Sequence, residues 1–247
     1  MQYTIAGFLF LSKELSKMNK NIKDENLRPL AQELSDVEAE FRKENGPEST
    51  EIFTHFIGEM DPAEIKSRAL KMDEVAPDFT LKNALGEAIT LSTEIKRGPV
   101  ILTWYRGGWC PYCNLTLAYL QRFLTQFRDA GAKLIAITPE KPDETLTTKE
   151  KHDLEFEVLT DDDNKIAKLY GGVHQLNQEV KDFYKDRGVL DHYDNNIQEF
   201  PVPATYIISS EGKVIYAFVE SDYRQRAEPA FIVGVIKQYQ KRHNGAS

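Results

Sequence analysis

The chain has 247 residues, enough for one domain or two small ones and for a sizeable hydrophobic core. An apolar content of 41% excludes a wholly disordered chain and a fibrous one. With 39 acidic and 31 basic residues the net charge is −8, which argues against nucleic acid as a partner. Two cysteines are too few for a secreted scaffold held together by disulfides.

An apolar run, YTIAGFLFL, occupies residues 3–11. It is shorter than the roughly 18–20 residues of a membrane helix. No lysine or arginine precedes it and no small-residue cleavage site follows it, so we expect neither a signal peptide nor a membrane partner. We interpret residues 1–17 as an extension of a cytoplasmic protein.

The segment before residue 72 is predicted to be helical. Apolar residues recur at spacings of three and four from Leu27 to Phe41, and Gly46 interrupts the pattern. A further helix is expected to begin at Asp61, which is followed by a proline in the first turn. We therefore predict an N-terminal helical extension over residues 1–71. A lid, a dimerisation element of a homodimer and a simple packing element are all compatible with it.

From residue 75 onward, predicted strands and helices alternate. The run over 100–105 is apolar and β-branched throughout, as in a strand buried on both faces. A strand over 134–138 is expected to run parallel to it after a helical crossover. The other predicted elements are helices over 143–152 and 164–170, a strand over 156–160, a polar insertion of unassigned structure up to residue 201, a hairpin over 204–219 and a closing helix. This order predicts an α/β domain over residues 72–247, with a mixed central sheet flanked by helices.

The two cysteines lie three residues apart in Cys110-Pro111-Tyr112-Cys113, between a buried strand and a helix. Pro111 suits the first helical position, which makes Cys110 the N-cap residue, where unpaired N–H groups and the helix dipole favour a thiolate. Cys113 is one turn further on, within disulfide reach. We predict that Cys110 is the exposed nucleophile and Cys113 the more buried resolving partner. Arg106, four residues before Cys110, is a candidate to stabilise the anion.

Two other interpretations of the cysteine pair remain open: ordinary buried thiols, and an iron–sulfur cluster shared between two chains. The five histidines show no metal-ligand spacing, so we expect neither a metal nor another cofactor. Gly107 and Gly108 are expected to let the backbone pass close to the cysteine and its substrate. Trp109 is expected to be either a core residue or a substrate contact.

Four segments, APDFTLKNALGEAITLS, PVILTWYRGGWC, DDDNKIAKLYGG and PATYIISSEGKVIY, resemble the peroxiredoxin superfamily in its alkyl hydroperoxide reductase and thiol-specific antioxidant group. The resemblance covers roughly residues 72–240, and the C-P-Y-C tetrapeptide is itself similar to the glutaredoxin active site. It implies a thioredoxin-like fold with Cys110 in the place of the peroxidatic cysteine.

Two features depart from that resemblance. Peroxiredoxins usually carry a threonine three residues before the reactive cysteine and a proline seven before it, where this chain has Gly107 and Thr103. Where peroxiredoxins place an arginine before a late strand, this chain has Pro203, which resembles the cis-proline of thioredoxins. We predict that the peptide bond before Pro203 is cis and that its ring lies against the cysteines. Arg226 or Arg224 is then the candidate to supply the missing positive charge.

The leading functional hypothesis is a thiol-dependent peroxidase. A peroxide would oxidise Cys110 to a sulfenic acid, Cys113 would condense with it to a disulfide, and thioredoxin or glutathione would return the electrons. One alternative is a thioredoxin- or glutaredoxin-like enzyme that exchanges disulfides. The other is a non-enzymatic redox sensor or binding module, in which the disulfide switches the helical extension.

Overall fold

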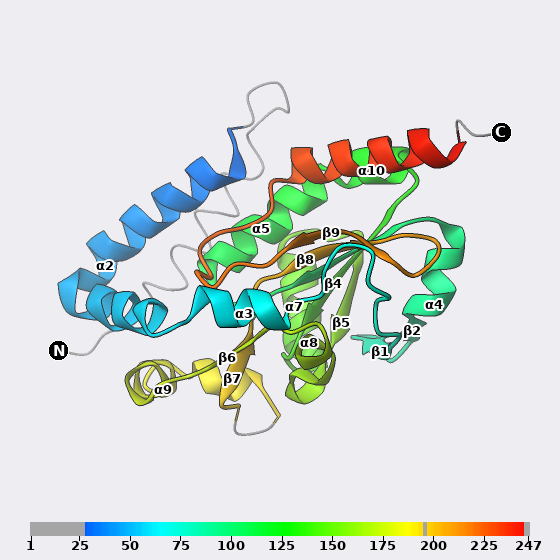
Figure 1. Ribbon diagram of the computed structural model, residues 1–247. Coiled ribbons are helices and arrows are strands. Elements are labelled where there is room, and N and C mark those ends of the chain that lie inside the picture. The colour runs from blue at the N-terminus through cyan, green and yellow to red at the C-terminus, as the bar shows by residue number, and fades with distance from the viewer. Residues whose placement is uncertain (1–27, 195–196, 245–247) are drawn as a thin grey trace.

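The computed structural model describes residues 28–194 and 197–244 (Figure 1). The extension predicted at residues 1–17 lies outside the described residues. Across the two described ranges, no helix is both long and apolar enough to cross a membrane.

Seven strands form one mixed sheet, in the spatial order β2-β1-β5-β4-β3-β8-β9. The strands are β1 (Thr80–Asn83), β2 (Ala88–Thr90), β3 (Val100–Trp104), β4 (Lys133–Thr138), β5 (Glu157–Thr160), β8 (Thr205–Ile208) and β9 (Val214–Phe218). The three central strands β5, β4 and β3 run parallel, and the flanking strands pair antiparallel. The predicted mixed sheet and the parallel pairing of β3 with β4 are therefore confirmed.

Helices cover both faces of the sheet, and each face has its own hydrophobic core. Side chains of β3 alternate between them, with Ile101 in one core and Leu102 in the other. The first core is covered by α5 (Pro111–Arg122), α6 (Leu124–Asp129) and α10 (Pro229–Asn244), and the second by α3 (Pro62–Arg68), α4 (Leu91–Glu94) and α8 (Lys165–Leu169). Because β3 is buried on both faces, it is a rigid base for whatever follows its carboxyl end.

The N-terminal helix α2 (Leu30–Gly58) packs against α5 and shares the first core with it (Figure 1). Its helical path breaks at Gly46, whose φ of 73° lies in the left-handed region that glycine adopts without strain, as the sequence predicts. The Glu228 carboxylate, just before α10, accepts the N–H groups of Leu30 and Ala31 at 3.1 and 2.8 Å. These contacts tie the helical extension to α5 and to the segment before α10.

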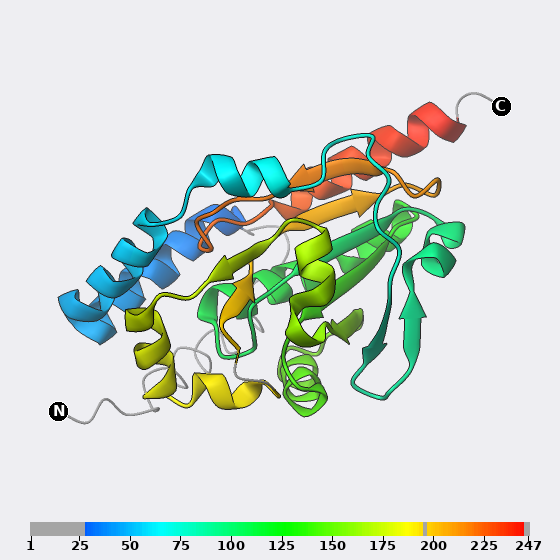
Figure 2. The ribbon, with the colours of Figure 1, turned by 60° about the horizontal axis from the view of Figure 1, so that its bottom comes forward.

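The polar insertion contains four short elements that the sequence did not reveal. They are β6 (Val173–Gln175), α9 (Gln178–Lys185), the 3₁₀ helix η4 (Val189–His192) and β7 (Glu199–Pro201). Figure 2 shows β6 and β7 outside the main sheet, where they pair antiparallel with each other. The helix α7 (Pro142–Lys151), which follows β4, matches its prediction.

The predicted cis bond before Pro203 is wrong, because the Val202–Pro203 bond is trans. The reason lies in the pairing on either side of the proline. The Val202 N–H donates to Gly172 O at 2.8 Å, and the Ala204 carbonyl accepts the N–H of Trp104 at 2.9 Å. These bonds hold the chain extended as it passes from β7 into β8. Pro203, which has no N–H to donate, occupies the position between them.

Candidate active site

The cysteines lie at the junction of the loop after β3 with the first turn of α5, at the carboxyl edge of the parallel strands. Cys110 is the N-cap of α5 and Pro111 its first residue, as the sequence predicts. The Cys110 N–H donates to Gly107 O at 3.1 Å, and this backbone hydrogen bond closes the turn between the strand and the helix. Cys113 is one turn further along the same helix, and both cysteines are free thiols.

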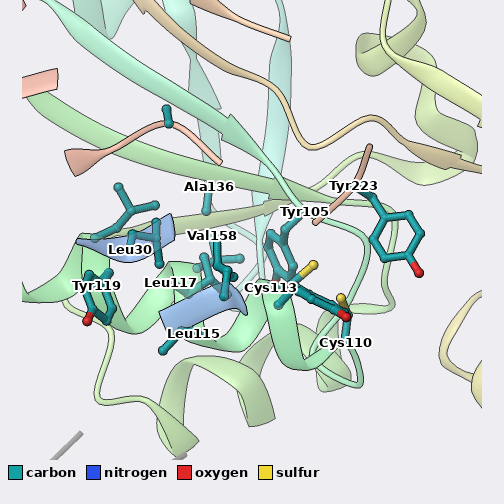
Figure 3. Packing of buried hydrophobic residues seen from close by; sticks show 14 of the residues in the cluster. Leu30, Tyr105, Cys110, Cys113, Leu115, Leu117, Tyr119, Ala136, Val158 and Tyr223 are labelled. Atoms are coloured by element: carbon teal, nitrogen blue, oxygen red, sulfur yellow. The ribbon is translucent and has the colours of Figure 1, made fainter. Parts of the chain in front are cut away.

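Both cysteines are fully buried, so the prediction that Cys110 is exposed is wrong. Figure 3 shows their sulfurs close together, with Tyr105 beside Cys113 and Tyr223 nearby. Two aromatic side chains next to the cysteines in the chain pack against three from distant parts of it and share their core cluster: Trp109 and Tyr112 with Tyr184, Phe200 and Tyr223. Phe53 of α2 packs against this aromatic cover, 6.3 Å from the Tyr223 ring between centroids. The helical extension therefore helps to exclude water from the cysteines.

Arg106 is a buried cation beside Cys110. Only 3% of the residue is exposed, and its Nη2 donates to the Cys110 Sγ at 3.1 Å. Its Nη1 donates to the Tyr184 hydroxyl at 3.0 Å, and its guanidinium lies 3.8 Å from the centre of the Tyr223 ring. A charge buried in this way needs a partner, and the sulfur is the group placed to provide a negative one.

The second guanidinium belongs to Arg226, whose Nη2 lies 3.7 Å from the Cys113 Sγ. Its Nη1 is held by the carbonyls of Tyr223 and Gln225. Arg224, the other candidate, instead contacts the carboxylates of Asp222 and Glu38. The structure thus brings Arg226 to the cysteines and directs Arg224 away from them.

The two sulfurs share a hydrogen bond, and their pKa values move in opposite directions. Burial raises the pKa of Cys110, and the hydrogen bond to Cys113 raises it further. Burial also opposes ionisation of Cys113, but the hydrogen bond from Cys110 and the two guanidinium groups outweigh it, so the pKa of Cys113 lies well below its ordinary range. These directions describe the pair as a unit. It loses its first proton readily and its second with difficulty, and therefore carries one thiolate.

Gly107 and Gly108 allow the turn to pass close to its neighbours. A Cβ on Gly107 would collide with the Trp109 ring and come within 2.7 Å of the Glu140 carboxylate, and a Cβ on Gly108 would collide with the Thr148 hydroxyl. The Gly108 N–H donates to Glu140 Oε1 at 2.8 Å. This contact fixes the turn that presents Cys110.

Sequence reasoning missed four residues that build the site: Glu140, Tyr184, Tyr193 and Tyr223. The Tyr193 hydroxyl accepts from Trp109 Nε1 at 2.6 Å and donates to the Arg106 carbonyl at 2.8 Å. No local pattern marks the three tyrosines. Glu140 had a usable signal, because it follows a parallel strand next to β3, and the carboxyl ends of such strands meet at one edge of a sheet.

The free energy of unfolding is expected to fall as the pH rises towards 8, because of Glu140. Burial raises the pKa of this carboxyl from 4.5 to about 8, so between those values the folded state binds a proton that the unfolded state does not. The contribution of Glu140 to the free energy of unfolding is therefore largest at acidic pH. It falls as the pH rises, by about 2 kcal/mol between pH 6 and pH 8. Urea unfolding at both pH values should show this fall in the native protein and a flatter dependence in Glu140→Gln. An equal fall in both proteins would contradict the assignment.

Known proteins resemble this chain in sequence and in fold. The family model described as AhpC/TSA family matches residues 72–217. Peroxiredoxin Bcp of Escherichia coli is 28% identical over 102 residues, which are 41% of this chain and 65% of that protein. The chloroplastic peroxiredoxin Q of Oryza sativa is 32% identical over 96 residues, 39% of this chain and 44% of that protein. The crystal structure of peroxidoxin BcpB from Mycobacterium tuberculosis superposes with a TM-score of 0.54 at 17% identity, covering 68% of this chain and 97% of that one.

Proposed function

This chain belongs to the AhpC/TSA family, and from that premise we propose that it reduces peroxides with Cys110 as the nucleophile and Cys113 as the resolving thiol. Its relatives are peroxiredoxins, so the chain is a thiol-dependent oxidoreductase with a peroxiredoxin-like antioxidant function. The observation that carries the proposal is the 3.1 Å contact between Arg106 Nη2 and Cys110 Sγ inside a buried site. A cation at that distance stabilises a thiolate, which is the reactive form of cysteine.

Cys110 is the better placed of the two sulfurs to attack. Its guanidinium contact is the shorter one, 3.1 Å against 3.7 Å for Cys113. It also adjoins Trp109, which is half-buried and is the next residue towards solvent in the chain.

The chemistry of the proposed cycle balances with these two sulfurs. The negative charge of the pair passes to Cys110 when the proton of the shared hydrogen bond moves to Cys113. The Cys110 thiolate then attacks a peroxide oxygen, so that an S–O bond forms and the O–O bond breaks, and the leaving oxygen takes up a proton and departs as water or alcohol. The Cys113 thiol then attacks the sulfenic sulfur, so that an S–S bond forms and the hydroxyl leaves as water with the thiol's proton. A thiol donor, thioredoxin or glutathione, supplies the two electrons that restore the pair.

The structure favours a peroxide over a protein disulfide as the oxidant. Disulfide exchange requires the attacked sulfur to reach Cys110 together with its own chain, and Cys110 is fully buried. The exchange hypothesis relied mainly on a cis bond before Pro203, and this bond is trans.

Stopped-flow mixing of the reduced protein with hydrogen peroxide tests the proposal. Trp109, in the turn before Cys110, provides a fluorescence signal close to the reacting sulfur. We expect thiol oxidation to be far faster than for free cysteine and to consume one peroxide per protein. Oxidation at the rate of free cysteine would exclude the peroxidase.

Replacing Cys113 with serine should separate the two steps. The first oxidation should proceed, because Cys110 keeps its contact with Arg106. The disulfide cannot form, so the protein should accumulate as a sulfenic acid that a dimedone probe labels, and turnover with a thiol donor should fall at least about tenfold. Loss of the first oxidation step in this variant would reverse the roles assigned to the two cysteines.

A further inference from the structure

The proposed cycle leaves Glu140 without a role, although it is a fully buried carboxyl next to the cysteine turn. It follows directly after β4 and Pro139, at the sheet edge where the cysteines lie. Its Oε1 accepts the Gly108 N–H at 2.8 Å, while its Oε2 has no hydrogen-bond partner among the described residues. A buried carboxylate with one oxygen unpaired destabilises the folded state, and protonation removes this penalty because it neutralises the charge.

Glu140 is electrostatically linked to the cysteine pair. Burial is the largest influence on its pKa, which rises to about 8, and the charges of Glu144 and Cys113 raise it further, while Lys151 opposes them. Tyr105 and Tyr193 also face it, and the charge of Glu140 raises the pKa of both hydroxyls. Among these neighbours, only Cys113 changes its charge when the cysteine pair is oxidised.

Two partly exposed polar side chains, His192 and Glu144, lie near Glu140. His192 Nδ1 lies 3.9 Å from Glu140 Oε1 and 2.8 Å from Glu144 Oε2. The His192 and Glu144 side chains are 30% and 37% exposed, so both reach water. Glu140 therefore lies beside side chains that are in contact with water.

We propose that Glu140 is the redox-linked proton acceptor of the Cys110–Cys113 pair. Reduction of the disulfide by a thiol donor takes up two electrons, breaks the S–S bond and leaves one thiol and one thiolate, which consumes one proton. Glu140 binds a second proton because the new thiolate repels its carboxylate. Oxidation to the disulfide removes the thiolate, so Glu140 binds its proton less tightly and releases it more readily. The buried site thereby avoids two adjacent negative charges in either state.

This proposal rests on the redox pair of the proposed function but not on peroxide as its oxidant. The test uses the full chain, reduced with dithiothreitol or oxidised with diamide, so it stands even if the stopped-flow experiment fails. Infrared difference spectra over a pH series would report the carbonyl stretch of a buried protonated carboxyl. We expect its titration midpoint to lie about one pH unit or more higher in the reduced protein than in the oxidised one.

Two variants assign the signal. Glu140→Gln keeps an oxygen for the Gly108 N–H and should lose the titrating band in both redox states. Glu150→Gln removes an exposed carboxyl from the same helix as Glu144 and should leave the band unchanged. Equal midpoints in the oxidised and reduced native protein would overturn the proposal, as would a redox-dependent shift that persists in Glu140→Gln.

A second measurement does not depend on the folding of any variant. The redox equilibrium of the native pair against a thiol–disulfide buffer, followed over pH, counts the protons taken up per two electrons. Between the two midpoints of Glu140 the count should rise above one, to about 1.5 for midpoints one pH unit apart and closer to two for a larger separation, and above both it should fall to one. A count of one throughout this range would show that Glu140 does not bind the second proton.

Discussion

Replacing Cys110 with serine is expected to slow peroxide reduction at least about 1,000-fold. A serine hydroxyl is not ionised near neutral pH. Its neighbour at this position is the Arg106 guanidinium, a cation that cannot accept the hydroxyl proton. The buried guanidinium keeps a negative partner in this variant, because Arg106 and Arg226 lower the pKa of Cys113, which carries the thiolate. We therefore expect a folded protein without peroxidase activity, to be measured by stopped-flow oxidation.

Cys113→Ser is the matched control, since it makes the same chemical change one helical turn away. Circular dichroism of both variants would establish that they fold. An equal loss of the first oxidation rate in the two variants would mean that neither sulfur alone is the nucleophile.

Replacing Arg106 with methionine should have the second largest effect. Methionine keeps much of the apolar volume packed on Tyr223 but removes the charge that contacts Cys110 at 3.1 Å. An opposite charge at such a distance lowers the pKa of an acid by about 1–3 units. Its loss should shift the pH dependence of peroxide reduction upward by a similar amount and lower the rate at neutral pH about 10- to 1,000-fold. Lysine at this position should restore the charge but not the forked contacts with Cys110 and Tyr184.

Arg224→Met is the control for the removal of one positive charge nearby. Arg224 contacts Glu38 and Asp222, not the sulfurs, so its loss should leave the pH profile in place. The thiolate absorbance in the ultraviolet, titrated in both variants, gives the pKa of the pair directly. An unchanged thiolate titration in Arg106→Met would contradict the role assigned to this residue.

The local geometry around the cysteines was predictable from short stretches of sequence. The apolar β-branched run over 100–105, the proline after Cys110 and the three-residue spacing to Cys113 predicted a strand, a helix N-cap and a neighbouring pair of sulfurs, and the structure has all three. Gly46 and Asp61 marked a helix break and a helix start correctly. These features depend on residues within one or two turns of each other, so their physical causes are contained in a short stretch of sequence.

The burial of the cysteines and the charges around them depend instead on long-range packing. The aromatic cover joins Trp109 to Tyr184 and Tyr223. Tyr184 belongs to a helix that local patterns did not assign, and the contacts of Tyr223 were not predicted from the sequence. The choice of Arg226 over Arg224 depends on which side chain Asp222 and Glu38 hold. The trans bond before Pro203 follows from pairing with Gly172 and Trp104, and Glu140 reaches the site because β4 lies beside β3. Each of these outcomes depends on contacts between residues far apart in the chain, which spacing and composition do not encode.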